Sequence, residues 1–207
     1  MNKNVRSVAL AAAVLSLAGL AGCDMISGYF RAQKAAVKWE GQIEEIAFSK
    51  LEKDGKVFDI EMHSRIDAPP DKVWEAMKQP QRLSEFSDQY KKSEVLKDEG
   101  NHKELELHVL ALDNLQTFTV SMDFDDATKT LKIKTITSSI ADIDGSYHLE
   151  PSPDGTKTAY IYKAKQTDKV ALPISESVQA SAIKESFVNQ VRAIKKQIGV
   201  EKPAAAG

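Results

Sequence analysis

The 207-residue chain contains a single cysteine, Cys23, only four histidines, and a nearly balanced charge with a formal net of −2. One cysteine excludes a disulfide framework, so packing must stabilise the fold. No His, Cys and carboxylate cluster has metal-ligand spacing, and no basic stripe with interleaved aromatic residues suggests nucleic-acid binding. Nucleophile-elbow, dinucleotide-binding and P-loop patterns are also missing. We therefore expect no metal, no cofactor and no nucleic-acid partner.

The longest apolar run lies at the N-terminus and is short for a membrane span. Lys3 and Arg6 precede residues 8–22, which form the kind of apolar stretch that is typical of a signal peptide. The run ends in Leu20-Ala21-Gly22-Cys23, which resembles the lipobox of bacterial lipoproteins. The resemblance implies cleavage before Cys23 and acylation of its thiol and amino group. An ordinary cleaved signal and an uncleaved anchor remain the alternatives.

These features predict a mature protein that is tethered to a bacterial envelope membrane and faces the periplasm. Residues 1–22 are then the signal peptide, and residues 23–45 a lipidated anchor with a partly helical linker. Two acyl chains hold a protein firmly, because each buried methylene contributes about 0.8 kcal/mol. Asp24 resembles the signal that keeps enteric lipoproteins in the inner membrane, so that membrane is slightly favoured over the outer one.

The last long segment, residues 173–198, has the pattern of an amphipathic helix. Apolar residues recur at steps of three and four, which places them on one side: Ile183, Phe187, Val191, Ile194 and Ile198. Ser175 or Ser177 can cap its start, and Gly199 can end it. Such a stripe requires an apolar partner.

Residues 57–167 supply that partner, because they alternate apolar and polar residues with the period of half-buried strands. The sequence predicts strands over residues 57–67, 104–111, 117–124, 131–137, 145–150 and 156–167. Asp71 is expected to cap a helix that runs to Met77, and residues 81–90 to form short helical pieces. Residues 46–51 fit either the linker or the first arm of a hairpin.

Several motifs along these elements resemble the START-like, or SRPBCC, superfamily, which includes polyketide cyclases and the birch pollen allergen group. They are the run Ile66-Asp67-Ala68-Pro69-Pro70-Asp71-Lys72-Val73-Trp74, the segment 145–150, the turn 154–156 and Leu172-Pro173. The resemblance implies an α+β helix-grip fold over residues 46–199, with a curved antiparallel sheet wrapped around the C-terminal helix and a hydrophobic cavity between them. Residues 200–207 are expected to be a disordered tail.

Acid–base catalysis requires a titratable side chain that reaches this cavity. Strand alternation places His63, His108 and His148 on the face away from the apolar residues, and Asp123 likewise. His102 falls in a polar segment that we expect to be a loop. We interpret all five as solvated surface residues, so no catalytic residue is assigned.

The inward positions are apolar or carry hydroxyl and amide groups. They are Phe118, Val120, Met122, Tyr147, Tyr160, Tyr162, Ile183, Phe187, Gln190 and Val191. Such a lining suits a hydrophobic molecule with one polar end, although the same residues could form a plain core. The sequence leaves three functions open. They are a membrane-tethered, monomeric binding protein for a lipid, quinone or sterol, an enzyme of the cyclase or hydrolase kind, and an interaction module that has a collapsed cavity and meets an envelope protein.

Overall fold

The computed structural model describes residues 37–42, 45–111, 114–171 and 173–200. The predicted signal peptide, Cys23, Asp24 and the predicted tail after Val200 lie outside these residues, so those expectations stay predictions. No helix in the described residues is long and apolar enough to cross a bilayer.

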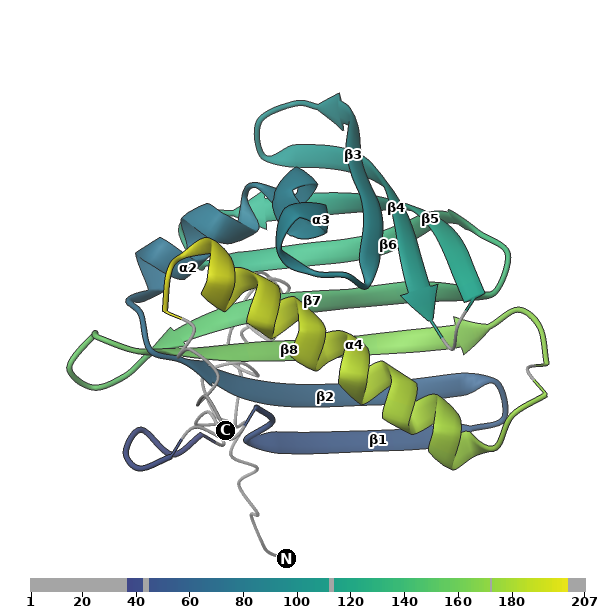
Figure 1. Cartoon of the computed structure of the whole chain (residues 1–207), viewed down its shortest axis with the longest axis horizontal. Helices are drawn as coiled ribbons and strands as arrows, with labels where there is room; N and C mark the ends of the chain where they lie inside the picture. The colour runs from purple at the N-terminus through teal and green to yellow at the C-terminus, as the bar shows by residue number, and fades with distance from the viewer. Residues whose placement is uncertain (1–36, 43–44, 112–113, 172, 201–207) are drawn as a thin grey trace, which may run out of the picture. The chain divides into compact units, whose positions relative to one another are not determined.

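Eight antiparallel strands form one curved sheet in the order β1-β2-β8-β7-β6-β5-β4-β3 (Figure 1). The strands are β1 (Phe48–Asp54), β2 (Val57–Ile66), β3 (Tyr90–Asp98), β4 (His102–Ala111), β5 (Asn114–Asp125), β6 (Thr130–Ser138), β7 (Ala141–Pro151) and β8 (Thr158–Asp168). The described helical segments are α2 (Pro70–Met77), η1 (Pro80–Arg82), α3 (Leu83–Phe86) and α4 (Glu176–Gln197). The chain enters the sheet through the β1–β2 hairpin, and η1 and α3 precede β3.

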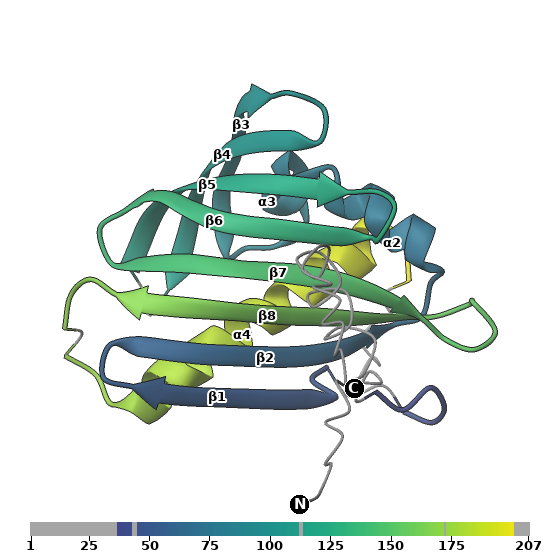
Figure 2. The same cartoon turned by 180° about the vertical axis from the view of Figure 1, so that it is seen from behind.

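The long helix α4 crosses one face of the sheet, and Figure 2 shows the sheet in front of it when the molecule is seen from behind. Ser175 Oγ accepts a hydrogen bond from Val178 N at the start of α4, and Gly199 adopts a positive φ of 70° just after its end. Phe187, Val191 and Ile194 pack with the inward residues of the sheet in the main hydrophobic core. The expected α+β helix-grip class is therefore confirmed.

Three local expectations are corrected or resolved. Residues 48–54 form β1, the first arm of the hairpin that the sequence left open. The strand β3 was not predicted, because as an edge strand it pairs only with β4 and carries charged residues on both faces. Asp71 makes no capping hydrogen bond, since Pro69 occupies the N-cap position. Asp71 instead lies in the first turn, with Oδ1 3.0 Å from Lys129 Nζ.

The segment before β1 packs on the outer face of the sheet. Val37 forms a small core with Ala159 and Ile161, and Trp39 packs against it. Arg65, which is 4% exposed, donates from Nη1 to Lys38 O (2.7 Å) and from Nη2 to Gly41 O (3.0 Å). The described part of the predicted linker thus contains no helix, and the packed domain extends back beyond residue 46, at least to Val37.

Candidate functional site

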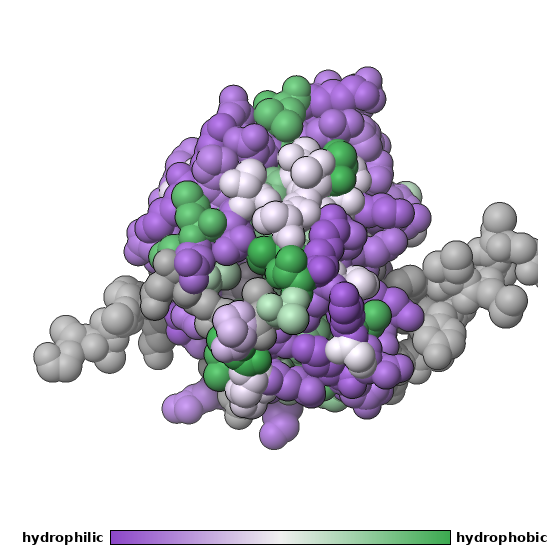
Figure 3. Space-filling view, turned by 90° about the vertical axis from the view of Figure 1, so that its right-hand side faces the viewer, coloured by the Kyte–Doolittle hydropathy of each residue, from purple (hydrophilic) through white to green (hydrophobic). Residues whose placement is uncertain are grey.

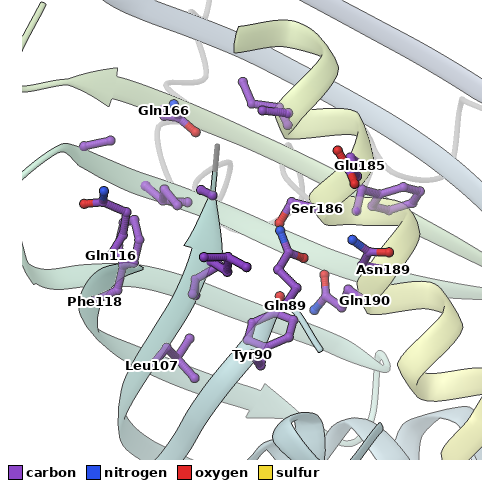
Figure 4. A pocket seen from close by; sticks show the side chains of 18 of the residues that line it. Gln89, Tyr90, Leu107, Gln116, Phe118, Gln166, Glu185, Ser186, Asn189 and Gln190 are labelled. Carbon is purple, nitrogen blue, oxygen red and sulfur yellow. The ribbon is translucent and has the colours of Figure 1, made fainter. Parts of the chain in front are cut away.

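A cavity of about 700 Å³ lies between the inner face of the sheet and α4 (Figure 4). Its walls come from strands β2 to β8, from residues 88–91 at the start of β3, and from residues 179–190 of α4. The volume lies in the range of small-molecule sites, about 300–1,000 Å³. The helix therefore covers the sheet without filling the space beneath it.

Seven of the ten predicted ligand residues line this cavity: Phe118, Val120, Tyr147, Tyr162, Ile183, Phe187 and Gln190. Tyr160 and Val191 are instead fully buried in the core and do not line the cavity. Met122 lies beside a second hollow of only about 20 Å³, together with Met77 and Ile194. Tyr160, Val191 and Met122 thus face inward as predicted, but other side chains fill the space around them.

Aromatic rings form one wall. The Tyr147 and Tyr162 rings stack with centroids 4.5 Å apart, and the Tyr162 ring lies 6.3 Å from that of Phe187. Tyr147 Oη donates to Gln190 Oε1 over 2.9 Å and so joins β7 to α4. These two polar groups of the predicted lining therefore partner each other, and this hydrogen bond does not need a ligand.

The phenols that line the cavity are poor proton donors and acceptors near neutral pH. Burial raises the pKa of Tyr147 and of Tyr162 well above the ordinary value, and it raises the pKa of Tyr90 to about 12. All three hydroxyls therefore stay protonated and act as neutral hydrogen-bonding groups. An efficient general base or acid has a pKa closer to the working pH.

The histidines do not line the cavity, but two expectations about them are wrong. His63 is only 3% exposed, and its ring lies 5.0 Å from that of Phe48, its partner on the neighbouring strand β1. Its Nε2 is 2.8 Å from Glu61 Oε1, and burial lowers its pKa. His102 is not in a loop but begins β4, where a hydrogen bond to Asp123 raises its pKa.

His108 and His148 lie on the outer face of the sheet, as alternation predicts, although both are half-buried. His108 Nε2 lies 3.0 Å from Glu106 Oε1. Thr130 Oγ1 lies 3.1 Å from His148 Nδ1, and burial lowers the pKa of His148. No group of three or more His, Cys, Asp or Glu side chains in the described part of the chain could hold a metal ion.

Sequence reasoning missed most of the carboxamides of the lining. Gln116 and Gln166 could have been found, because they continue the inward alternation of Phe118 and of Tyr162 along their strands. Gln89 could not, since it precedes the unpredicted strand β3. Asn189 directly precedes Gln190 on α4 and was not singled out.

The charged side chains of the cavity lining are exposed at the protein surface. The three charged residues of the lining, Asp88, Lys91 and Glu185, are all exposed. Two exposed large apolar residues, Leu115 and Val178, neighbour the lining residues Gln116 and Gln179 in the chain, although neither of them lines the cavity. Figure 3 views the end of the molecule that holds the β4–β5 and β8–α4 connections, where apolar surface gathers among hydrophilic residues.

Comparison with known proteins agrees with this architecture. The model of the family described as polyketide cyclase / dehydrase and lipid transport matches residues 66–192. No curated protein matches the sequence. Among solved structures, the ZhuI aromatase/cyclase from Streptomyces sp. R1128 is similar, with a TM-score of 0.63 and 18% identity over 73% of this chain and 99% of that one.

Two further structures share the fold. A START superfamily protein from Mycobacterium smegmatis has a TM-score of 0.57 and 11% identity, over 70% of this chain and 98% of that one. A STAR-related lipid transfer protein from Xanthomonas axonopodis has a TM-score of 0.53 and 13% identity, over 73% of this chain and 98% of its fragment. At these identities the likeness concerns the fold alone.

Proposed function

Because the chain belongs to the polyketide cyclase / dehydrase and lipid transport family, we propose that it binds a hydrophobic small molecule, such as a lipid, quinone or sterol, between the sheet and α4. The observation that carries this proposal is the cavity of about 700 Å³ with its aromatic and aliphatic walls. Burying apolar ligand surface there is favourable by roughly 25 cal/mol per Å². The cavity is open, which argues against the alternative of an interaction module with a collapsed cavity.

A binding role fits the lining better than acid–base catalysis does. The only carboxylates among the described lining residues, Asp88 and Glu185, are exposed at the protein surface, and the buried phenols have raised pKa values. A cyclase or hydrolase reaction by general acid–base chemistry would need a titratable group against the bound molecule. The similarity to the aromatase/cyclase supports the fold, but it does not show that this chain catalyses the same reaction.

We further propose that the domain works at an envelope membrane, held there by acylated Cys23 and facing the periplasm. The support is the lipobox-like run that ends at this single cysteine, and Asp24 favours the inner membrane. Fractionation of cells that express the full chain tests it. Cys23→Ser is expected to move the protein out of the membrane fraction, and equal membrane recovery of both forms would contradict the tether.

The binding proposal is tested by extracting the purified full chain with organic solvent and identifying co-purifying molecules by mass spectrometry. Ile183 lines the cavity, so Ile183→Trp should fill part of it and lower the recovered ligand at least about tenfold. Ser181→Trp is the matched control, because Ser181 is exposed on the same helix and does not line the cavity. Equal recovery from both variants would refute binding at this site.

A further inference from the structure

The inside of the cavity contains no formal charge. The lining has only three charged side chains, Asp88, Lys91 and Glu185, and each of them is exposed. Lys53, on the edge strand β1, does not line the cavity, but its Nζ donates to Oε1 of the lining residue Gln179 and lies 3.5 Å from Asp168 Oδ2. Its charge is therefore already compensated. Lys91 is the only cation among the described lining residues, and it is exposed at the surface, so a buried anionic group inside the cavity would find no cation beside it.

One wall presents a group of polar but neutral side chains. Figure 4 shows Gln89, Ser186, Asn189 and Gln190 directed into the same part of the cavity, from the start of β3 and from α4. Gln89 Oε1 is fully buried and has no hydrogen-bond partner in the described part of the structure. Leaving such a group unpaired costs about 1–3 kcal/mol, and because this oxygen is closed to solvent, a bound molecule would pair with it once the Gln89 side chain turns it toward the cavity.

The side-chain amide of Gln190 already has a hydrogen-bond partner at its oxygen. Gln190 Oε1 accepts from Tyr147 Oη at 2.9 Å, so the group that Gln190 can still offer a ligand is its Nε2 amide. Each carboxamide carries both a donor and an acceptor. The wall formed by Gln89, Asn189 and Gln190 thus offers both kinds of hydrogen-bonding group at one place, with stacked tyrosines beside it.

We propose that the bound molecule is electrically neutral and carries a donor–acceptor head, such as an amide or a hydroxyl, that lies against Gln89, Asn189 and Gln190. The inference rests on the proposed binding function and narrows its ligand class. A neutral head pairs with the carboxamides, whereas an ionised carboxylate or phosphate would lose its hydration without gaining a counter-charge. Among the exposed charged residues of the lining, the two carboxylates Asp88 and Glu185 outnumber the single cation Lys91, so the net charge there does not favour an anion.

Oleamide, oleyl alcohol and oleate test this, because they share one hydrocarbon chain and differ in the head. The affinity of each is measured by its ability to displace the neutral fluorophore N-phenyl-1-naphthylamine from the full chain at pH 8, where oleate is ionised. We expect oleamide to bind at least about tenfold more tightly than oleate, with oleyl alcohol also ahead of oleate. Oleate binding equal to or tighter than oleamide would overturn the neutral-head inference and leave the binding function standing. If neither the fluorophore nor any of the three binds, both proposals fail.

A pair of variants locates the head. Gln89→Leu should weaken oleamide about fivefold to tenfold and change oleate less than about twofold, since only the amide loses its partner. Gln166→Leu is the matched control, because Gln166 lines the cavity but its Nε2 already donates to Asp168 Oδ1 over 3.2 Å. An unchanged oleamide affinity in Gln89→Leu would overturn the assigned position. The comparison of the three ligands on the unaltered chain does not depend on whether either variant folds.

Discussion

Replacing Gly145 by alanine is expected to destabilise the sheet where β7 pairs with β8. Gly145 lies opposite Ala164, and both point toward the inner face. A Cβ atom at Gly145 would lie 2.6 Å from Ala164 Cβ and 2.8 Å from Lys163 O. Carbon atoms in contact prefer about 3.5–4.0 Å, so the strands would have to separate by roughly 1 Å.

The size of the effect follows from this overlap. Overpacking of a well-filled region costs about 1–3 kcal/mol, and the smaller entropy of an unfolded chain with alanine returns about 0.4–1 kcal/mol. The expected net loss is about 1–2 kcal/mol, which corresponds to a Tm that is lower by about 2–8 °C in a domain of this size. Neither clashing atom is the end of a flexible side chain, so the strain cannot be relieved by a rotamer change.

Urea unfolding followed by circular dichroism measures this loss, with Ser146→Ala as a neighbouring control that should stay within about 0.5 kcal/mol. Adding Ala164→Gly to Gly145→Ala removes the contact at 2.6 Å but leaves Lys163 O in place, so it should restore part of the stability. The double variant should then be more stable than the sum of the two single changes predicts, by at least about 0.5 kcal/mol. Additive effects, or a Gly145→Ala protein as stable as its parent, would refute the reasoning.

Two further predictions concern the outer face. Burial holds the pKa of His63 below its unfolded value near 6.5, so its contribution to stability is present above about pH 6.5 and is lost as the pH falls toward the folded pKa. Urea midpoints at pH 7.5 and 5.5 should therefore differ less in His63→Phe than in the parent, and an equal difference would contradict this. Arg65→Met leaves two backbone carbonyls and Asp67 without their partner and should cost about 2–4 kcal/mol in the same unfolding assay. Arg192→Met is its control, because that ion pair with Glu45 is exposed and should matter by less than about 0.5 kcal/mol.

The fold was predictable because local patterns repeat along each element. Period-two alternation marked most of the strands, and the 3.6-residue period marked α4 with its Ser175 cap and Gly199 end. The strand β3 lacked such a pattern, since an edge strand with charges on both faces buries little on either side. Burial of His63 was equally unpredictable, because its neighbours Phe48 and Ile161 come from the adjacent strands β1 and β8.

The sequence by itself determined which side chains face α4 and which face outward, because alternation along a strand follows from local backbone geometry. Only the tertiary structure decided which inward residues meet an open space. Phe118 lines the cavity while Met122, on the same face of the same strand, does not. The difference depends on how α4 packs over the curved sheet along its length, and on Gln89, which comes from the turn before β3. Both are set by packing among elements remote in sequence, which no local period encodes.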